Sequence, residues 1–212
     1  MRIRPFIFLS VLLAGATSTS AQSGRGQWSL GPYVGGSFDS AVGNRWGITP
    51  GRQSLFVGLH ARVPLVERPR WSFNWAPELV PLLIVTHNPR YETLTDAAGG
   101  KTFVLLTPAP VAGFGFAPIG LEAQGALRSR VRAYGAGALG GLIFTRNTPV
   151  VDARKFNFTA EFGGGLLWRI HPRLWLRTGY KFHHFSNAKT APNNPGVDAH
   201  VFYLGMERML AS

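Results

Sequence analysis

Apolar and polar residues alternate along several stretches of the chain. Between residues 70 and 79, one parity carries Trp71, Phe73, Trp75, Pro77 and Leu79, and the other carries Arg70, Ser72, Asn74, Ala76 and Glu78. The same split recurs at 54–63, where Phe56 is the exception, and at 156–169. Successive side chains of a β-strand point to opposite faces. The pattern therefore predicts strands with one apolar and one polar face.

The alternation predicts about eight strands. They lie near residues 28–38, 53–63, 70–86, 102–116, 130–145, 156–169, 173–186 and 199–210. Pro108, Pro110 and Pro118 interrupt the fourth, and proline removes a ladder donor, so this strand is expected to bend or to resume after Gly120. Short links such as 170–173 alternate with longer ones, as in membrane barrels.

The polar face indicates where these strands fold. A soluble sandwich would alternate in the same way, so alternation alone does not place the chain in a membrane. However, Arg62, Glu78, Glu161, Arg177 and Lys181 lie in mid-strand on the polar face among small residues, which fits a narrow interior filled by paired charges. We predict an all-β fold, an eight-stranded antiparallel transmembrane β-barrel. A soluble periplasmic β-protein is the alternative.

The first residues are typical of an export signal. Met1-Arg2-Ile3-Arg4 precedes an apolar run over 5–16 and the small residues Thr19-Ser20-Ala21, the three regions of a secretory signal peptide. We predict a signal peptide over 1–21 and a single barrel domain over 22–212. No later stretch offers the ~20 apolar residues that a membrane helix needs. Together with the barrel pattern, this predicts a Gram-negative outer-membrane protein.

Composition removes several classes of function. The chain has no cysteine, which argues against a disulfide scaffold and against thiolate metal sites. The net charge of +12 is scattered, without the basic stripe of a nucleic-acid-binding protein, and suits an anionic surface such as phosphorylated lipid. We therefore predict no nucleic-acid partner. His60, His87 and His171 lack the spacing of metal ligands, so we also predict no metal site.

The seventh predicted strand carries the candidate chemistry. His184 and Ser186 share its more apolar face, about 7 Å apart along the backbone. That face is expected to meet lipid, at the outward end of the strand. Because polar side chains cost desolvation there, a functional reason is needed. A polar strand end that simply meets water is the alternative.

Ester hydrolysis supplies such a reason. A histidine can accept the serine proton as general base, while a carboxylate on its other nitrogen orients the ring. The nearest acid, Asp198, begins the eighth strand with the parity of the apolar Phe202 and Leu204, so it is expected beside His184. Asn187 follows the serine and could donate to an oxyanion. His183 has the opposite parity and is expected inside the barrel, whereas His200 shares the outer face.

One segment resembles a known family. His184-Phe185-Ser186-Asn187-Ala188, followed by Pro192-Asn193-Asn194-Pro195-Gly196 and Asp198, is similar to the active-site segment of the lipid A 3-O-deacylase (PagL, acyloxyacyl hydrolase) family. A weaker resemblance extends back through 156–159 and 161–166 to Gly179-Tyr180, and forward to Gly205. It covers the last third of the chain.

The resemblance implies an eight-stranded barrel with a Ser-His-acid triad open to the outer leaflet. His184 and Ser186 would be base and nucleophile, and Asp198 the orienting acid, where the family pattern has a glutamate that is longer by one methylene. The implied activity is hydrolysis of the ester-linked 3-hydroxyacyl chain of lipid A, with lipopolysaccharide as substrate, outer-membrane lipids as surroundings and no cofactor. The chain length of the acyl group and the oligomeric state stay open.

Two further expectations accompany this hypothesis. Basic loop residues are expected to meet the sugar phosphates or simply to be solvated: Arg45, Arg52, Arg90, Arg146, Arg154 and Lys189. The competing function is a non-enzymatic small outer-membrane barrel, structural or adhesive, that keeps the fold without turnover.

Overall fold

The computed structural model describes residues 27–38, 46–49, 51–86, 91–96, 98–107 and 110–210. The expected signal peptide and its boundary lie outside this part of the chain. The strands are β1 (Ser29–Ser37), β2 (Gln53–Glu67), β3 (Trp71–Trp75), β4 (Glu78–Thr86), β5 (Tyr91–Thr95), β6 (Lys101–Leu105), β7 (Val111–Gly125), β8 (Val131–Thr148), β9 (Arg154–His171), β10 (Leu174–Ser186) and β11 (Val197–Met209). No helix in the described ranges is long and apolar enough to span a membrane.

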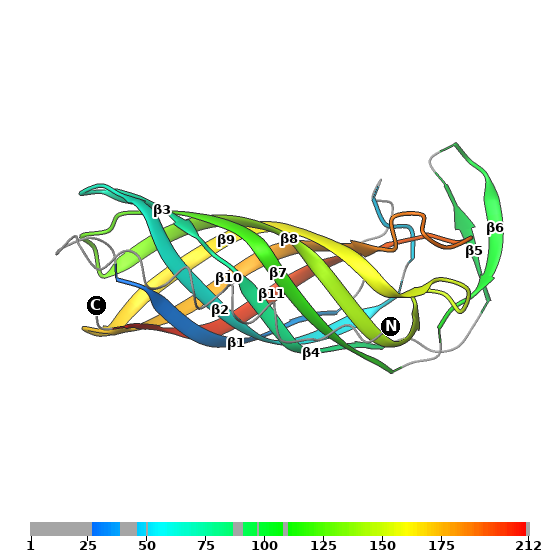
Figure 1. The fold of residues 1–212 in the computed structure, drawn as a ribbon, viewed down its shortest axis with the longest axis horizontal. Helices are drawn as coiled ribbons and strands as arrows, with labels where there is room; N and C mark the ends of the chain where they lie inside the picture. The colour runs from blue at the N-terminus through cyan, green and yellow to red at the C-terminus, as the bar shows by residue number, and fades with distance from the viewer. Residues whose placement is uncertain are drawn as a thin grey trace, which may run out of the picture.

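Nine of these strands form one antiparallel sheet that closes on itself (Figure 1). β1 pairs with β2 on one side and with β11 on the other, which closes the ring. β3 and β4 both lie between β2 and β7, so they are successive pieces of one strand and the ring has eight strands. The predicted eight-stranded antiparallel barrel is confirmed.

Three prolines, at 77, 81 and 118, lie where a strand is interrupted or a ladder shifts register. Ala76 and Pro77 separate β3 from β4, and the pairing of β4 with β7 shifts between Val80 and Leu83, around Pro81. The pairing of β7 with β8 shifts between Phe116 and Ile119, around Pro118. Because proline donates no backbone hydrogen bond, a bulge lets it remain inside a strand without leaving a partner unsatisfied.

The fourth predicted strand was misplaced. We expected it at 102–116, but the wall strand β7 spans Val111–Gly125, and residues 101–105 form β6. β6 pairs only with β5, in a separate two-stranded sheet beyond the barrel wall (Figure 1). The prolines at 108 and 110 separate two apolar stretches that the alternation had joined. β7 then continues through Pro118 by a bulge instead of restarting after Gly120.

The two faces of the wall have the polarity that the alternation predicts. Large apolar side chains project outward around the ring, among them Leu30, Val57, Phe116, Leu139, Phe158, Phe162, Phe202 and Leu204, all more than a third exposed. Inward positions of the wall include many buried polar side chains, as at Ser72, Asn74 and Asn157. An apolar belt around a polar interior is the arrangement of a transmembrane barrel.

Two groups of paired charges fill the middle of the interior. Lys181 lies 2.5 Å from Glu78 and 2.9 Å from Glu161. Arg177 pairs with Glu122 and Glu207, and Arg62 also binds Glu207 at 2.9 Å. These side chains are almost fully enclosed, so each charge depends on its partner for solvation. The predicted interior of paired charges is confirmed.

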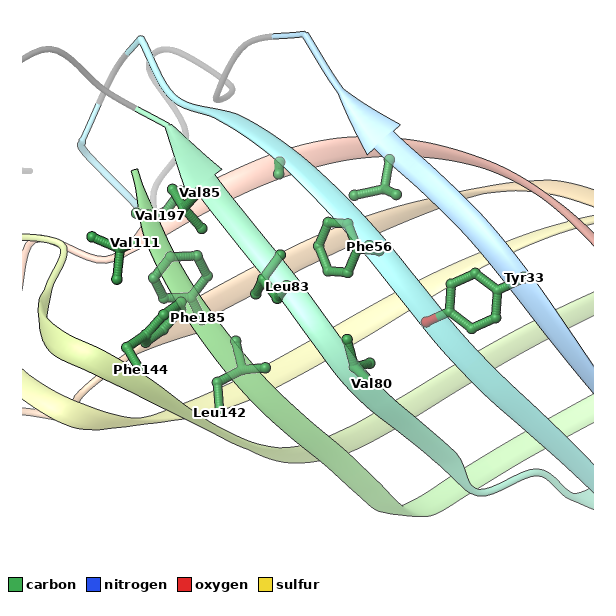
Figure 2. Packing of buried hydrophobic residues seen from close by; sticks show 12 residues of the cluster. Tyr33, Phe56, Val80, Leu83, Val85, Val111, Leu142, Phe144, Phe185 and Val197 are labelled. Atoms are coloured by element: carbon green, nitrogen blue, oxygen red, sulfur yellow. The ribbon is translucent and has the colours of Figure 1, made fainter. Parts of the chain in front are cut away.

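An apolar cluster closes the lumen beyond these charges. Figure 2 shows Phe56, Leu83, Phe144 and Phe185 converging between the strands, with Val85, Val111 and Val197 around them. The Phe144 and Phe185 rings lie 5.3 Å apart. The exception to the alternation, Phe56, is therefore explained, because it points inward and belongs to this cluster. Apolar side chains therefore occupy the lumen on the outer side of the charged groups.

The lengths of the links orient the barrel. Ser29 pairs with Met209, so the described ends of the chain lie at one end of the barrel. All links at that end are short, over 68–70, 126–130 and 172–173. At the other end 149–153 is equally short, but the other three links are longer and span 38–52, 87–110 and 187–196. Outer-membrane barrels have short periplasmic turns and long extracellular loops. The end that carries β5 and β6 is therefore the outer end.

Candidate active site

The candidate site lies at the outer end of β10 and β11, on the lipid-facing side of the wall. His184 pairs directly with Asp198 across the two strands. Cross-strand neighbours of this kind bring their side chains together on one face, and His184 Nδ1 lies 2.6 Å from Asp198 Oδ1. The structure thus brings together the histidine and the acid that parity placed side by side. Their catalytic roles stay predictions.

Asp198 is completely buried although it lies on the outer face. Its Oδ1 accepts from the imidazole, and its Oδ2 accepts from the backbone N–H of Gly47 at 2.9 Å. A buried carboxylate needs such partners to remain charged. The Asp198 side chain reaches the imidazole because the two residues are directly opposite, so the missing methylene relative to a glutamate does not prevent contact.

His184 is held on several sides and keeps a narrow opening, with 15% of its side chain exposed. The Trp46 ring meets the imidazole edge-on, with centroids 5.9 Å apart and planes at 83°. Gly196 packs beneath the ring, since a Cβ there would lie 3.0 Å from His184 Cε1, and its φ of +61° already favours glycine. Donation of the Nδ1 proton to Asp198 leaves Nε2 as the acceptor nitrogen.

Ser186 ends β10 on the same face and is partly exposed. It pairs with Phe158 of β9, whose ring is exposed on the outer wall. Among the described residues the Ser186 hydroxyl makes no hydrogen bond, so His184 and Ser186 share a face without being joined. Hydrogen bonds between nucleophile and base are often long without substrate and tighten in the complex.

Asn187 fastens the loop that follows Ser186. Its backbone N–H donates to Asn194 Oδ1 at 2.8 Å, and its side-chain Nδ2 donates to the carbonyl of Asn193 at 2.8 Å. Thr190 bonds back to the Asn187 carbonyl through its N–H and its hydroxyl. Asn187 is fully buried, and its expected role as oxyanion donor stays a prediction. The next two residues, Ala188 and Lys189, have φ of +51° and +62°.

Sequence reasoning missed the segment Trp46–Thr49, which we call the strap. Trp46 packs on Phe162 and Phe182 as well as on His184, so it lies across the outer face of β9 and β10. The strap comes from the long link between β1 and β2 and has no alternation of its own. No pattern in the sequence indicates that a backbone N–H at position 47 meets Asp198.

The other predicted residues have varied positions. His183 is buried inside the barrel, as expected, 3.1 Å from Glu161. His200 is exposed on the outer face, where its ring stacks on Tyr180. Among the basic loop residues, Arg146, Arg154 and Lys189 are exposed, and Arg45 and Arg90 lie outside the described residues.

For Arg52 the expectation was wrong. It is 1% exposed and donates to the carbonyl of Pro149, so it holds loops together and does not face lipid headgroups. The buried guanidinium replaces solvent with protein acceptors. Within the described ranges, no group of three or more side chains has the composition of a metal site.

Comparison with known proteins identifies the fold and the family of this chain. The sequence has no match among the curated proteins. The chain is similar in fold to the crystal structure of the outer-membrane enzyme PagL, with a TM-score of 0.57 and 15% identity over 84% of this chain and 97% of that one. It is also similar to Neisserial surface protein A, with a TM-score of 0.54 and 9% identity over 86% and 97%. At these identities the likeness shows the fold alone, that of an outer-membrane barrel.

A family model gives the more specific result. The model of lipid A 3-O-deacylase (PagL) matches residues 56–207, from β2 to β11. The match includes His184, Ser186 and Asp198, together with β9, β10 and β11 up to residue 207. The resemblance noted in the last third of the sequence therefore extends over most of the chain, and the protein belongs to the lipid A 3-O-deacylase (PagL) family.

Proposed function

We propose that this protein is an outer-membrane lipid A deacylase that uses Ser186, His184 and Asp198 as a catalytic triad. The observation that carries the proposal is the His184–Asp198 hydrogen bond, 2.6 Å long, on the lipid-facing side of the outer end beside a free serine hydroxyl. Lipid A occupies the outer leaflet of the outer membrane, which surrounds this end of the barrel. The substrate ester would therefore reach the serine by lateral movement in the membrane.

The first half of the reaction follows from the two ring nitrogens. As Ser186 Oγ attacks the carbonyl carbon of the ester, its proton passes to His184 Nε2, and Asp198 stabilises the resulting imidazolium through Nδ1. The tetrahedral intermediate then collapses. The bond to the sugar oxygen breaks, His184 returns the proton to that oxygen, and an acyl-serine remains.

Water completes the turnover. His184 accepts a proton from a water molecule that attacks the acyl-serine, and the same proton returns to Ser186 Oγ as the fatty acid leaves. No cofactor takes part. By the family to which the chain belongs, we propose that the bond cleaved is the ester of the 3-hydroxyacyl chain at the 3-position of lipid A.

Backbone groups after Ser186 offer a second set of oxyanion donors besides Asn187. The Asn187 backbone N–H and one side-chain N–H are already used within the loop. The N–H groups of Ala188 and Lys189 have no hydrogen-bond partner among the described residues, and both residues have positive φ. Consecutive N–H groups in such a turn form an anion-binding concavity. We propose that they share the oxyanion with the second side-chain proton of Asn187.

The test compares lipid A from bacteria with defined lipopolysaccharide that express the wild type, Ser186→Ala or Ser129→Ala. Ser129 lies exposed in a turn at the opposite end and serves as the matched control. Mass spectrometry should show loss of one hydroxyacyl chain with the wild type and with Ser129→Ala, and intact lipid A with Ser186→Ala. A heat-dependent shift in gel mobility verifies that each barrel is folded. Intact lipid A in all three would identify a non-enzymatic barrel instead.

A further inference from the structure

The strap is bound to the loop before β11 by its backbone. Ile48 N donates to the carbonyl of Pro195 at 2.8 Å, and Thr49 N and Oγ1 both donate to the carbonyl of Gly196. Together with the bond from Gly47 N to Asp198 Oδ2, these bonds join the strap to Pro195, Gly196 and Asp198. This is a docked segment with a defined position, not a loop that passes near the site.

Side-chain packing anchors the strap on the side that faces the outer-end loops. Ile48 packs against an apolar loop cluster that consists of Leu94, Val104, Leu106, Val150 and Ala153. Leu94 belongs to β5 and Val104 to β6, Leu106 follows β6, and Val150 and Ala153 lie in the link between β8 and β9. A bridge between Leu106 and Val150 joins the two parts. The strap is thus held between the outer-end loops and the His184–Asp198 pair.

We propose that the strap is a positioning element of the active site, in which Gly47 holds the Asp198 carboxylate and Trp46 holds the His184 ring. The proposal rests on the hydrolase function proposed above. Trp46 contacts the proposed base His184, and Gly47 contacts the acid Asp198. Neither is placed to take part in the bond changes themselves. They act on catalysis through the orientation of the imidazole.

The physical effect of Gly47 concerns the second carboxylate oxygen. Asp198 Oδ1 is directed at the histidine, and an unsatisfied Oδ2 in a fully buried site would turn toward any available donor and weaken that direction. The Gly47 N–H fixes Oδ2 and so fixes the rotamer of the side chain. A Cβ at position 47 would lie 2.7 Å from Asp198 N, so the approach requires glycine.

Trp46 limits the space in which the His184 ring can move. Its ring stands edge-on to three aromatic rings, with centroids 5.9 Å from His184, 5.9 Å from Phe182 and 6.2 Å from Phe162. Phe182 is only 9% exposed although it points outward, because the strap covers it. The same cover limits rotation of the imidazole and keeps water from the His184–Asp198 bond. A Phe at position 46 would preserve much of this aromatic cover over His184, and an Ala would remove it.

The experiment compares Trp46→Ala and Trp46→Phe with Trp71→Ala, an exposed tryptophan of β3 at the periplasmic end. Activity is measured on purified lipid A in detergent micelles. We expect Trp46→Ala to lower kcat about tenfold or more with little change in KM, because ring misplacement acts on the chemical step. Trp46→Phe should recover most of the rate, and Trp71→Ala should match the wild type.

A spectroscopic measurement keeps this test independent of turnover. The His184 Nδ1 proton in a short bond to a buried carboxylate should give a far-downfield proton resonance, assigned by its loss in His184→Gln. It should persist in Ser186→Ala and Trp71→Ala, and broaden or disappear in folded Trp46→Ala. An unchanged resonance and rate in Trp46→Ala would overturn the positioning role. If no variant or wild type hydrolyses lipid A, the hydrolase proposal fails, and the resonance alone decides whether the strap holds the pair.

Discussion

Two consecutive histidines of β10 each meet a carboxylate, and our proposal gives a catalytic role to only one of them. His183 points into the barrel, where Glu161 lies 3.1 Å from its Nδ1 and the Phe56 ring packs against it. His184 points outward to Asp198, with Ser186 next on the same face. Composition does not distinguish the two pairs. What distinguishes them is Ser186, the proposed nucleophile, on the same face as His184, and the partial exposure of His184 on the outer wall.

The inner pair also has a different electrostatic role. Glu161 binds Lys181 as well as His183, and Lys181 in turn binds Glu78, so the inner histidine belongs to a network that balances buried charge. Asp198 has one imidazole and one backbone N–H. An acid with a single titratable partner can direct that partner, whereas an acid shared among several serves to neutralise them.

The largest expected effect separates the two histidines directly. His184→Gln should reduce deacylation on the order of 10⁴-fold, because it removes the proposed base, which would also protonate the leaving oxygen. His183→Gln should keep activity close to that of the wild type. Initial rates on purified lipid A in micelles measure both. Comparable losses in the two variants would contradict the division of roles between the faces.

The next prediction concerns the inner network alone. Lys181→Met leaves Glu78 and Glu161 facing each other without their shared cation, and breaking a buried pair of this kind costs about 3–5 kcal/mol. Urea unfolding of the refolded barrel should show this loss in the free energy of unfolding. The exposed Lys155→Met is the matched control. The folded fraction of Lys181→Met should still hydrolyse lipid A, and a folded but inactive protein would place the network in the active site.

Asp198→Glu tests how closely the His184–Asp198 pair depends on the length of the acid. A glutamate restores the residue of the family pattern, but the site is completely buried and Gly47 approaches closely, which leaves no room for a methylene. We expect activity to fall about tenfold, or about 1.4 kcal/mol in the barrier. Asp198→Asn, which has the same size, should lose far more because the ring loses its charged partner. Equal or higher activity in Asp198→Glu would show that the strap adapts to the longer acid.

The smallest effect is expected at Gly196, which packs beneath the His184 imidazole. Gly196→Ala introduces a Cβ 3.0 Å from His184 Cε1 at a φ of +61°. The left-handed conformation alone should cost about 1 kcal/mol of stability, and the contact should lower the rate a few-fold. Thermal unfolding and rate assays measure the two parts. Gly125→Ala, where an added Cβ meets no atom within 4 Å, is the control and should leave the rate unchanged.

Sequence reasoning succeeded where the strand period determines the answer. The parity of β10 and β11 placed His184, Ser186 and Asp198 on one face, and placed His183 on the other, because side chains alternate in any strand. The same rule identified Lys181 and Glu161 as interior charges before any contact was known.

It failed where tertiary contacts determine the answer. The sequence pattern joined residues 102–105 to the wall strand that follows them, and only the pairing of β6 with β5 shows that this hairpin stands apart from the ring. The buried Arg52 could not be distinguished from a solvated arginine, because its acceptor at Pro149 is 97 residues away. The strap has no periodic pattern, and its contact with Asp198 is made by the backbone, which carries no sequence information.

The bond between Gly47 and Asp198 also bears on assembly of the barrel. His184 and Asp198 are 14 residues apart on adjacent strands, so that contact can form as soon as β10 and β11 pair. Gly47 and Asp198 are separated by 151 residues. The strap precedes β2, and it can reach β11 only when β1 has brought the first strands beside the last. A chain that has not closed its ring holds an acid with one oxygen unsatisfied, so the proposed enzyme would mature only after insertion into the membrane that contains its substrate.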